Sequence, residues 1–196
     1  MTDIILKHPA LAQLVSLSAQ PPVGADNLLG CTLQELSDFA KACGQPSYRG
    51  KQLFEALFKQ RVQSFEGITN LPKAFRAALE KQYVMDRPRA DQIEVSDDGT
   101  RKYRFVGPDG LAFESVYIPQ VAKGGRTTNT LCVSSQTGCA VGCGFCYTAS
   151  LRRNRNLAAA EIVGQVLAVQ DDVTSLGETA KVTNIVYMGM GEPLLN

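Results

Sequence analysis

The sequence has no apolar run long enough to cross a bilayer, and its N-terminus lacks a basic start followed by an apolar core. These two absences predict a cytoplasmic protein with no membrane partner. A pattern of evenly paired cysteines is also missing. Because three of the six cysteines are clustered, the composition favours reduced thiols and metal ligation over a secreted disulfide framework.

A fourth cysteine is missing where a complete metal cage would need one. Cys139, Cys143 and Cys146 form a Cys-x3-Cys-x2-Cys run with no further cysteine after it. Complete iron–sulfur cages normally take four thiolates, so three would leave one iron open for a substrate. A zinc knuckle is the alternative, because Cys132 could supply a fourth ligand. The run therefore predicts a reactive iron–sulfur cluster, with zinc as the minority interpretation.

Charge of one sign does not dominate, since the net charge is only +1, but the charge is unevenly distributed. Residues 48–106 carry twelve Lys and Arg against eight Asp and Glu, and residues 107–156 carry five against two. Both ends of the chain are acidic. A basic zone of this kind can follow a phosphate backbone, although a solvated mixed surface explains the charges equally well.

The first third of the chain predicts helices. Thr32 and Glu35 fit a capping box that opens a helix ending near Gly44. Apolar residues at helical spacing predict two more helices, over about 49–61 and 70–83. These three helices predict a compact helical domain.

After the helical domain, the sequence pattern becomes typical of β-strands. Turn signals at Asp98-Gly99 and Asp109-Gly110 predict an antiparallel meander, and residues 120–129 read as a polar connector. A strand over 131–135, a helix over 157–176 and a strand over 182–190 then form one βαβ unit. Because a lone βαβ unit has two unpaired strand edges, we expect an N-terminal portion of a larger α/β enzyme. The predicted segments are a connector over 1–30, a helical domain over 31–89, the meander and linker over 90–129, and the βαβ unit over 130–196.

A second chemical signal ends the last predicted strand. There, Gly191 and Glu192 stand in a Gly-Met-Gly-Glu-Pro stretch. Glycines let backbone groups approach a ligand closely, and a carboxylate beside them can receive an ammonium group. The stretch is a weak signal alone, but one βα unit after a three-cysteine loop it forms a specific pair.

The cysteine run, with Phe145 before its last cysteine, resembles that of radical S-adenosylmethionine enzymes. We expect Phe145 either to shield a cluster from water or to pack in the fold. Further motifs resemble the RlmN/Cfr family of adenosine methyltransferases, most closely its RlmN branch. These motifs are Tyr48-Arg49-Gly50-Lys51-Gln52-Leu53, Leu71-Pro72-Lys73, Asp98-Gly99-Thr100-Arg101-Lys102-Tyr103, Glu114-Ser115-Val116-Tyr117-Ile118-Pro119, Thr130-Leu131-Cys132-Val133-Ser134-Ser135-Gln136, Asn154-Arg155-Asn156-Leu157 and residues 188–196.

The resemblance implies a fold, two cofactors and site residues. The βαβ unit would begin a partial (βα)6 barrel. Cys139, Cys143 and Cys146 would hold a 4Fe–4S cluster whose open iron chelates S-adenosylmethionine. Gly191 and Glu192 would form the cofactor site and bind the methionine part of S-adenosylmethionine. The catalytic residues would be Glu114, which would accept a proton, and Cys132, which would form a transient disulfide. Without the family, Cys132 reads as a small buried strand residue and Glu114 as an exposed one.

The resemblance also implies a reaction and its partners. The family's RlmN branch methylates carbon 2 of an adenosine in 23S rRNA and in tRNA, and its Cfr branch methylates carbon 8. One S-adenosylmethionine would methylate a cysteine that follows Asn196 in the whole enzyme. A second S-adenosylmethionine would be cleaved at the cluster to a radical that activates this methyl group. The chain alone is therefore expected to be inactive. The whole enzyme is expected to be a monomer that takes electrons from a flavodoxin-type reductant. The helical domain and the stretch 152–155 would position the RNA.

Overall fold

The computed structural model describes residues 27–121, 127–151, 154–177 and 181–196. The connector predicted over 1–30 lies almost entirely outside these residues. The chain divides into two compact units, Met1–Asp86 and Arg87–Asn196, each with its own core. Among the described residues, no helix is both long enough and apolar enough to cross a membrane.

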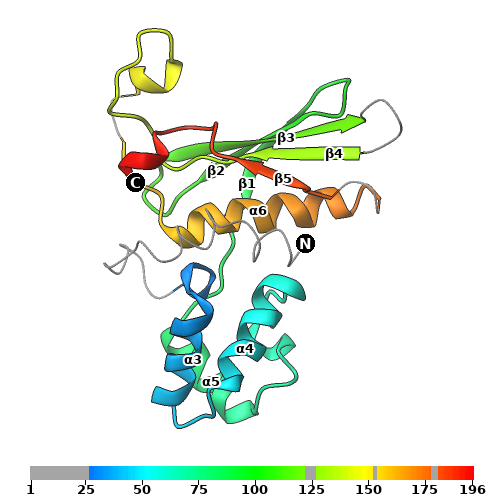
Figure 1. The fold of residues 1–196 in the computed structure, drawn as a ribbon, viewed down its shortest axis with the longest axis vertical. Coiled ribbons are helices and arrows are strands. Elements are labelled where there is room, and N and C mark those ends of the chain that lie inside the picture. The colour runs from blue at the N-terminus through cyan, green and yellow to red at the C-terminus, as the bar shows by residue number, and fades with distance from the viewer. Residues whose placement is uncertain (1–26, 122–126, 152–153, 178–180) are drawn as a thin grey trace. The chain divides into compact units, whose positions relative to one another are not determined.

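The described part of the first unit is helical (Figure 1). Its first α-helix begins as predicted, because the Thr32 hydroxyl accepts from the Glu35 N–H at 3.1 Å and the Glu35 carboxylate accepts from the Thr32 N–H at 2.7 Å. The elements of this unit are η1 (Leu28–Gly30), α3 (Leu33–Ala42), α4 (Tyr48–Phe54), η2 (Glu55–Lys59), η3 (Phe65–Gly67) and α5 (Lys73–Gln82).

The helix predicted over 49–61 is not a single α-helix. After α4 the chain continues as the π-helical segment η2, in which the Gln60 N–H donates to the Glu55 carbonyl at 2.9 Å. All three side chains of residues 56–58, which lie in this wider turn, are buried.

The second unit is built on a five-stranded sheet in the order β1-β2-β3-β4-β5. Neighbouring strands are antiparallel except β4 and β5, which are parallel and connected through α6. The predicted mixed α/β architecture, with helices followed by a sheet, is confirmed. The elements are β1 (Ala90–Val95), β2 (Arg101–Val106), β3 (Ala112–Val121), β4 (Thr127–Cys132), η4 (Tyr147–Ser150), α6 (Ala159–Thr174), β5 (Asn184–Val186) and η5 (Pro193–Leu195).

The prediction of two unpaired edges in the βαβ unit is wrong. β3 pairs with β4 from Val116↔Cys132 to Val121↔Thr127, so the meander and the βαβ unit share one sheet. The connector predicted over 120–129 is wrong for the same reason, because both of its ends are strand and only residues 122–126 lie outside the described chain. This pairing satisfies backbone groups that a separate meander would leave open.

One face of the sheet packs against α6 (Figure 1). The aromatic side chains of Tyr103, Phe105, Phe113 and Tyr117 alternate along β2 and β3 and are all buried on this face. The Tyr103 hydroxyl donates to the Asp172 carboxylate of α6 at 2.7 Å. Burial is the main cause that raises the pKa of Tyr103, and the Asp172 carboxylate adds to it. The hydrophobic core of this unit therefore lies between α6 and the middle of the sheet.

Candidate cofactor site at the ends of two parallel strands

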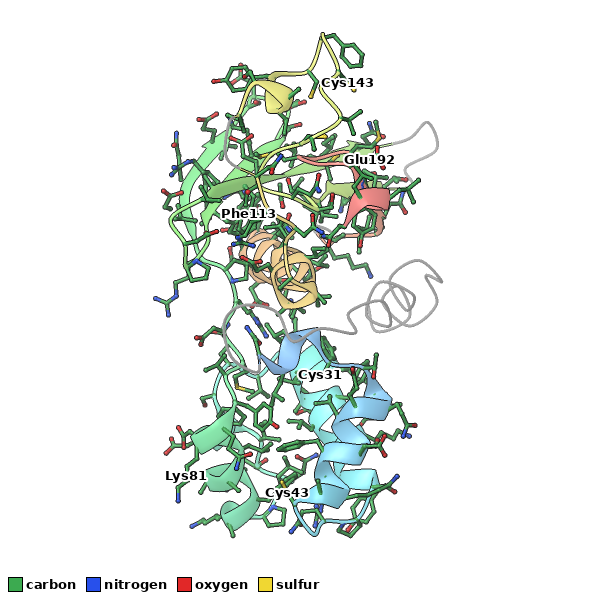
Figure 2. All side chains as sticks on the ribbon, turned by 90° about the vertical axis from the view of Figure 1, so that its left-hand side faces the viewer. Cys31, Cys43, Lys81, Phe113, Cys143 and Glu192 are labelled. Atoms are coloured by element: carbon green, nitrogen blue, oxygen red, sulfur yellow. The ribbon has the colours of Figure 1, made fainter. Side chains whose placement is uncertain are left out.

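β4 and β5 run in the same direction, so the segments that follow them leave the sheet at one edge. Backbone hydrogen bonds continue beyond both strands: the Val133 N–H donates to the Val186 carbonyl at 2.9 Å, and the Gly189 N–H donates to the Val133 carbonyl at 3.2 Å. The segment that leads into the cysteine loop (residues 139–146) therefore lies beside the start of the cofactor loop (residues 189–196). Figure 2 shows Cys143 and Glu192 on these two loops.

Gly191 lies against the segment that leads into the cysteine loop. Its φ of +98° is in the region that favours glycine. A Cβ atom at this position would lie 2.6 Å from the Cβ of Gln136 and 2.8 Å from its backbone nitrogen. No side chain fits there without displacing one of the two segments. The predicted close approach at Gly191 is thus made to the protein's own backbone.

Gln136 connects the cofactor loop to Asn156 through the two ends of its amide. Its Oε1 accepts a hydrogen bond from the Glu192 N–H at 2.9 Å, and its Nε2 donates to Oδ1 of Asn156 at 2.8 Å. The far end of the cofactor loop is held separately, since the Asn196 side chain donates to the carbonyls of Ser135 at 2.7 Å and Leu157 at 3.1 Å. The cofactor loop is therefore fixed at both ends to segments beside the cysteine loop.

Ser134 connects this edge to the sheet and to α6. Its hydroxyl donates to the Glu114 carbonyl and accepts from the Met190 N–H at 2.8 Å. The Gln165 side chain of α6, which is fully buried, binds the Ser134 N–H at 2.9 Å and the Ser134 carbonyl at 3.0 Å. The Ser115 hydroxyl of β3 also donates to Gln165, at 2.6 Å. This buried network links the strand of Glu114, the end of β4 and the cofactor loop.

Glu114 and Cys132 lie on the face of the sheet opposite α6. Cys132 is directly opposite Val116, and Glu114 is two residues from Val116 on the same strand, so both side chains share this face. Lys102 lies opposite Val116 on the other side, with its Nζ 3.8 Å from the Glu114 carboxylate and 3.1 Å from that of Glu94. The two predicted catalytic residues are thus neighbours on one partly exposed surface.

The thiol chemistry of Cys132 is governed by its burial. Burial raises the pKa of the Cys132 thiol above its ordinary value. Cys132, Cys139, Cys143 and Cys146 all carry free thiols, so the structure contains no disulfide among them. The transient disulfide implied for Cys132 is therefore absent from this state.

Local backbone turns order the cysteine loop. The Cys146 N–H donates to the Cys143 carbonyl at 3.0 Å, which closes the Cys-x2-Cys segment into a turn. The pKa of Cys146 is lowered, first by the backbone N–H of Ala149 and then by that of Thr148. Phe145 is 95% exposed, so the expectation that it packs in the fold is wrong, whereas its role in shielding a cluster stays a prediction.

The donor set of the cysteine loop fits an iron–sulfur cluster. Three thiols lie on one loop, and one of them is shifted toward the thiolate form that binds metal. Within the described ranges, no three His, Cys, Asp or Glu side chains converge closely enough to hold a metal ion. The three thiols would hold a cluster only after the loop brings their sulfurs to one centre.

Arg155 is paired within the protein. It belongs to the stretch 152–155 that is predicted to position RNA, which stays a prediction, and it forms ion pairs with Asp109 and with Glu161, the latter at 2.7 Å. The hydrogen bonds to Glu161 and then Asp109 raise the pKa of Arg155. Arg155 is thus a bridge between the β2–β3 turn and the start of α6, while residues 152–153 lie outside the described chain.

Sequence reasoning missed the residues that hold the two loops together, namely Ser134, Gln136, Asn156 and Gln165. Ser134 and Gln136 stand just before the cysteine run, where polar side chains between a buried strand and a loop are a usable signal. Gln165 breaks an apolar helix at an inward position, which also predicts a buried polar contact. Their partners are far apart in sequence and could not be assigned.

Known proteins resemble this chain along most of its length. A family model described as "Ribosomal RNA large subunit methyltransferase N-terminal domain" matches residues 26–85. A protein of Syntrophobacter fumaroxidans named "Dual-specificity RNA methyltransferase RlmN" is 46% identical over 165 residues, which cover 84% of this chain and 46% of that protein. A protein of the same name from Ruegeria pomeroyi is 39% identical over 202 residues, covering 97% and 50% of the two chains.

A solved structure agrees with these relatives. The crystal structure of a radical SAM methyltransferase from Sphaerobacter thermophilus matches with a TM-score of 0.74 and 39% identity, over 87% of this chain and 48% of that one. The chain spans about half the length of the curated relatives that it matches. Because the family model covers the helical unit and the relatives also cover most of the sheet unit, the chain belongs to the RlmN family.

Proposed function

We propose that this chain forms part of a radical S-adenosylmethionine methyltransferase that methylates carbon 2 of an adenosine in 23S rRNA and in tRNA. The supporting observation is the placement of the cofactor loop beside residues 133–136, which lead into the cysteine loop, with Gln136 bound to the Glu192 N–H. Relatives named dual-specificity RNA methyltransferases support the RNA substrate. The proposal includes a cytoplasmic location, a monomeric whole enzyme and a flavodoxin-type electron donor.

The two loops would bind the two cofactors. Cys139, Cys143 and Cys146 would hold a 4Fe–4S cluster, and Gly191 with Glu192 would bind the methionine part of S-adenosylmethionine. Together these groups supply one-electron cleavage of S-adenosylmethionine, which is the radical chemistry that the reaction needs. The protein's own contribution is to hold the cofactor loop beside the cluster and to exclude water from the site.

Glu114 and Cys132 would act on the RNA side of the reaction. Both lie on the sheet face that α6 leaves open, where a flipped adenine could reach them. Glu114 would accept a proton from the methylated adenosine, with Lys102 beside its carboxylate. Cys132, a free thiol in this structure, would attack the sulfur that links the enzyme to the RNA, so that a transient disulfide forms while the sulfur–carbon bond breaks and its electron pair leaves with the RNA.

Metal analysis gives the first test of this proposal. After anaerobic reconstitution with iron and sulfide, we expect the chain to hold iron and sulfide in equal amounts and to show a paramagnetic signal on reduction. Addition of S-adenosylmethionine should change that signal, because the cofactor would bind the open iron. A single tetrahedral zinc with no iron–sulfur absorption would instead support a zinc-stabilised RNA-binding module.

A hybrid enzyme tests the reaction itself. Residues 27–196 would replace the matching half of the Syntrophobacter fumaroxidans relative, in a host that lacks its own enzyme of this type. Mass spectrometry of 23S rRNA and tRNA nucleosides should then find 2-methyladenosine, whereas the isolated chain should form none. Detection of 8-methyladenosine instead would assign the chain to Cfr-type chemistry.

A further inference from the structure

We propose that Gln136 is a positioning residue that sets the place of the Gly191–Glu192 backbone relative to the cysteine loop, and thereby the affinity for S-adenosylmethionine. The inference rests on the proposed function, since it concerns the cofactor of that site. Gln136 would bind neither the cluster nor the cofactor. It would act only through the two loops that do.

The first support is that the Gln136 side chain is buried and hydrogen-bonded at both ends of its amide. Gln136 is only 6% exposed, and a buried amide is costly unless both of its ends are hydrogen-bonded. Here both ends are used, by the Glu192 N–H and by Asn156. The orientation of the amide is therefore fixed, and with it the direction of the Glu192 N–H.

The second support is steric and independent of these hydrogen bonds. The space that a Cβ atom of Gly191 would need is occupied by Gln136 atoms, the nearest at 2.6 Å. The backbone N–H of Gln136 also donates to the Met190 carbonyl at 3.1 Å. Gln136 thus contacts three consecutive residues of the cofactor loop, by packing and by two kinds of hydrogen bond.

The third support is the position of Gln136 in the chain. It stands three residues before Cys139, at the point where the chain leaves β4 for the cysteine loop. Other ties of the cofactor loop lie on either side of Gly191 and Glu192: Met190 is bound by Ser134 and Ser135, and the far end is held through Asn196 and the Leu195 carbonyl. Loss of the Gln136 side-chain contacts would therefore release Gly191 and Glu192 while both ends of the loop stay attached.

Three variants test the inference. Gln136→Leu keeps the side-chain volume and removes both hydrogen bonds. Gln136→Glu keeps an acceptor for the Glu192 N–H and loses the donor to Asn156, so it separates the two hydrogen bonds. The matched control is Gln170→Leu, which removes a buried glutamine of α6 that accepts from the Val182 N–H at 2.9 Å, away from both loops.

The measurements separate positioning from general stability. In Gln136→Leu we expect unchanged iron content, faster hydrogen exchange at the Glu192 amide, and a dissociation constant for S-adenosylmethionine raised about tenfold or more. Gln136→Glu should keep a protected Glu192 amide and lose much less affinity. Gln170→Leu should lower the melting temperature and leave the dissociation constant unchanged.

Two results would overturn the inference. One is an unchanged dissociation constant in Gln136→Leu when its Glu192 amide has lost protection. The other is an equal loss of affinity in Gln170→Leu, which would make the effect one of stability. Failure of the proposed function looks different: the wild-type chain would bind no cluster or no S-adenosylmethionine, while the exchange measurement would still report the Gln136 contact.

Discussion

The cysteine loop and the cofactor loop leave the same edge of the sheet, yet they are held in different ways. Short-range backbone turns order the cysteine loop, as between Cys146 and Cys143. The cofactor loop is held by side chains from distant segments, chiefly Gln136 and Asn196. The cofactor loop is therefore held by the rest of the sheet unit, whereas the cysteine loop is ordered by contacts within itself.

This difference follows from the chemistry that each loop would perform. A cluster supplies strong bonds to three thiolates, and such bonds can close a loop that is only loosely ordered. S-adenosylmethionine binds the protein through weaker contacts, so its site benefits from being preorganised. The contrast predicts that substitutions in the cysteine loop affect metal content without affecting folding, and that substitutions around the cofactor loop affect both binding and stability.

The largest expected effect is on metal content. Cys143→Ser should abolish assembly of the iron–sulfur cluster, because serine is a poor ligand for iron. The free energy of unfolding should hardly change, since this loop adds little to the core. Iron analysis and denaturant unfolding measure the two quantities. Cys43→Ser in the helical unit serves as the control and should retain iron; a large loss of stability in Cys143→Ser would contradict the contrast.

The next largest effect is expected at Gln165, in the buried hydrogen-bond network that links α6 to Ser134 and the cofactor loop. Gln165→Leu leaves the Ser134 N–H, the Ser134 carbonyl and the Ser115 hydroxyl without this partner. Unpaired buried groups of this kind should lower the free energy of unfolding by about 3 kcal/mol. Urea unfolding gives the value, and hydrogen exchange at the Met190 amide reports the cofactor loop.

Gln170→Leu is the comparison for that variant, because it removes a buried glutamine from the same helix. It should lower the free energy of unfolding by about 1–2 kcal/mol and leave the Met190 amide protected. Equal deprotection of Met190 in both variants would show that the loop responds to helix stability in general.

A smaller and more local effect is expected at Gly191. Gly191→Ala introduces a Cβ atom against Gln136 and places an L-residue at φ +98°. The strain should be about 1–3 kcal/mol and should appear as opening of the cofactor loop rather than global unfolding. Hydrogen exchange at residues 190–192 would detect that opening. Gly110→Ala is matched for backbone strain, because φ is +75° there and nothing lies within 4 Å; opening confined to Gly191→Ala would isolate the contact.

The comparison of the loops also shows what could be read from the sequence. Cys139 and Gly191 were found as motifs because their spacing and residue types encode their chemistry locally. The capping box at Thr32 and Glu35 was predicted for the same reason, since both partners lie within one turn. Gln136 carries an equally important contact, but its partner Glu192 is 56 residues away.

Pairing of the strands was the main failure of prediction, and the cause is physical. The polar stretch 120–129 looks like a connector because strands at an open sheet face need few apolar residues. The antiparallel register from Val116 to Val121 is determined by contacts with the preceding strands and α6, which no local pattern contains. The ion pair of Arg155 could not be read from the sequence either, since its partner Asp109 lies on a different turn.

The smallest expected effect concerns Cys132, which lies on β4 rather than on either loop. Burial raises the pKa of its thiol, so a smaller fraction is thiolate near pH 8 than in an unfolded chain, and alkylation should be slower in the folded protein. The rate should increase with pH and reach half its maximum at a higher pH than for the same cysteine in urea. Mass spectrometry of the Cys132 peptide gives both profiles. Restricted access alone would slow the reaction equally at every pH and leave the midpoint where it is in urea; that outcome would show that the sheet protects Cys132 sterically instead of through its protonation.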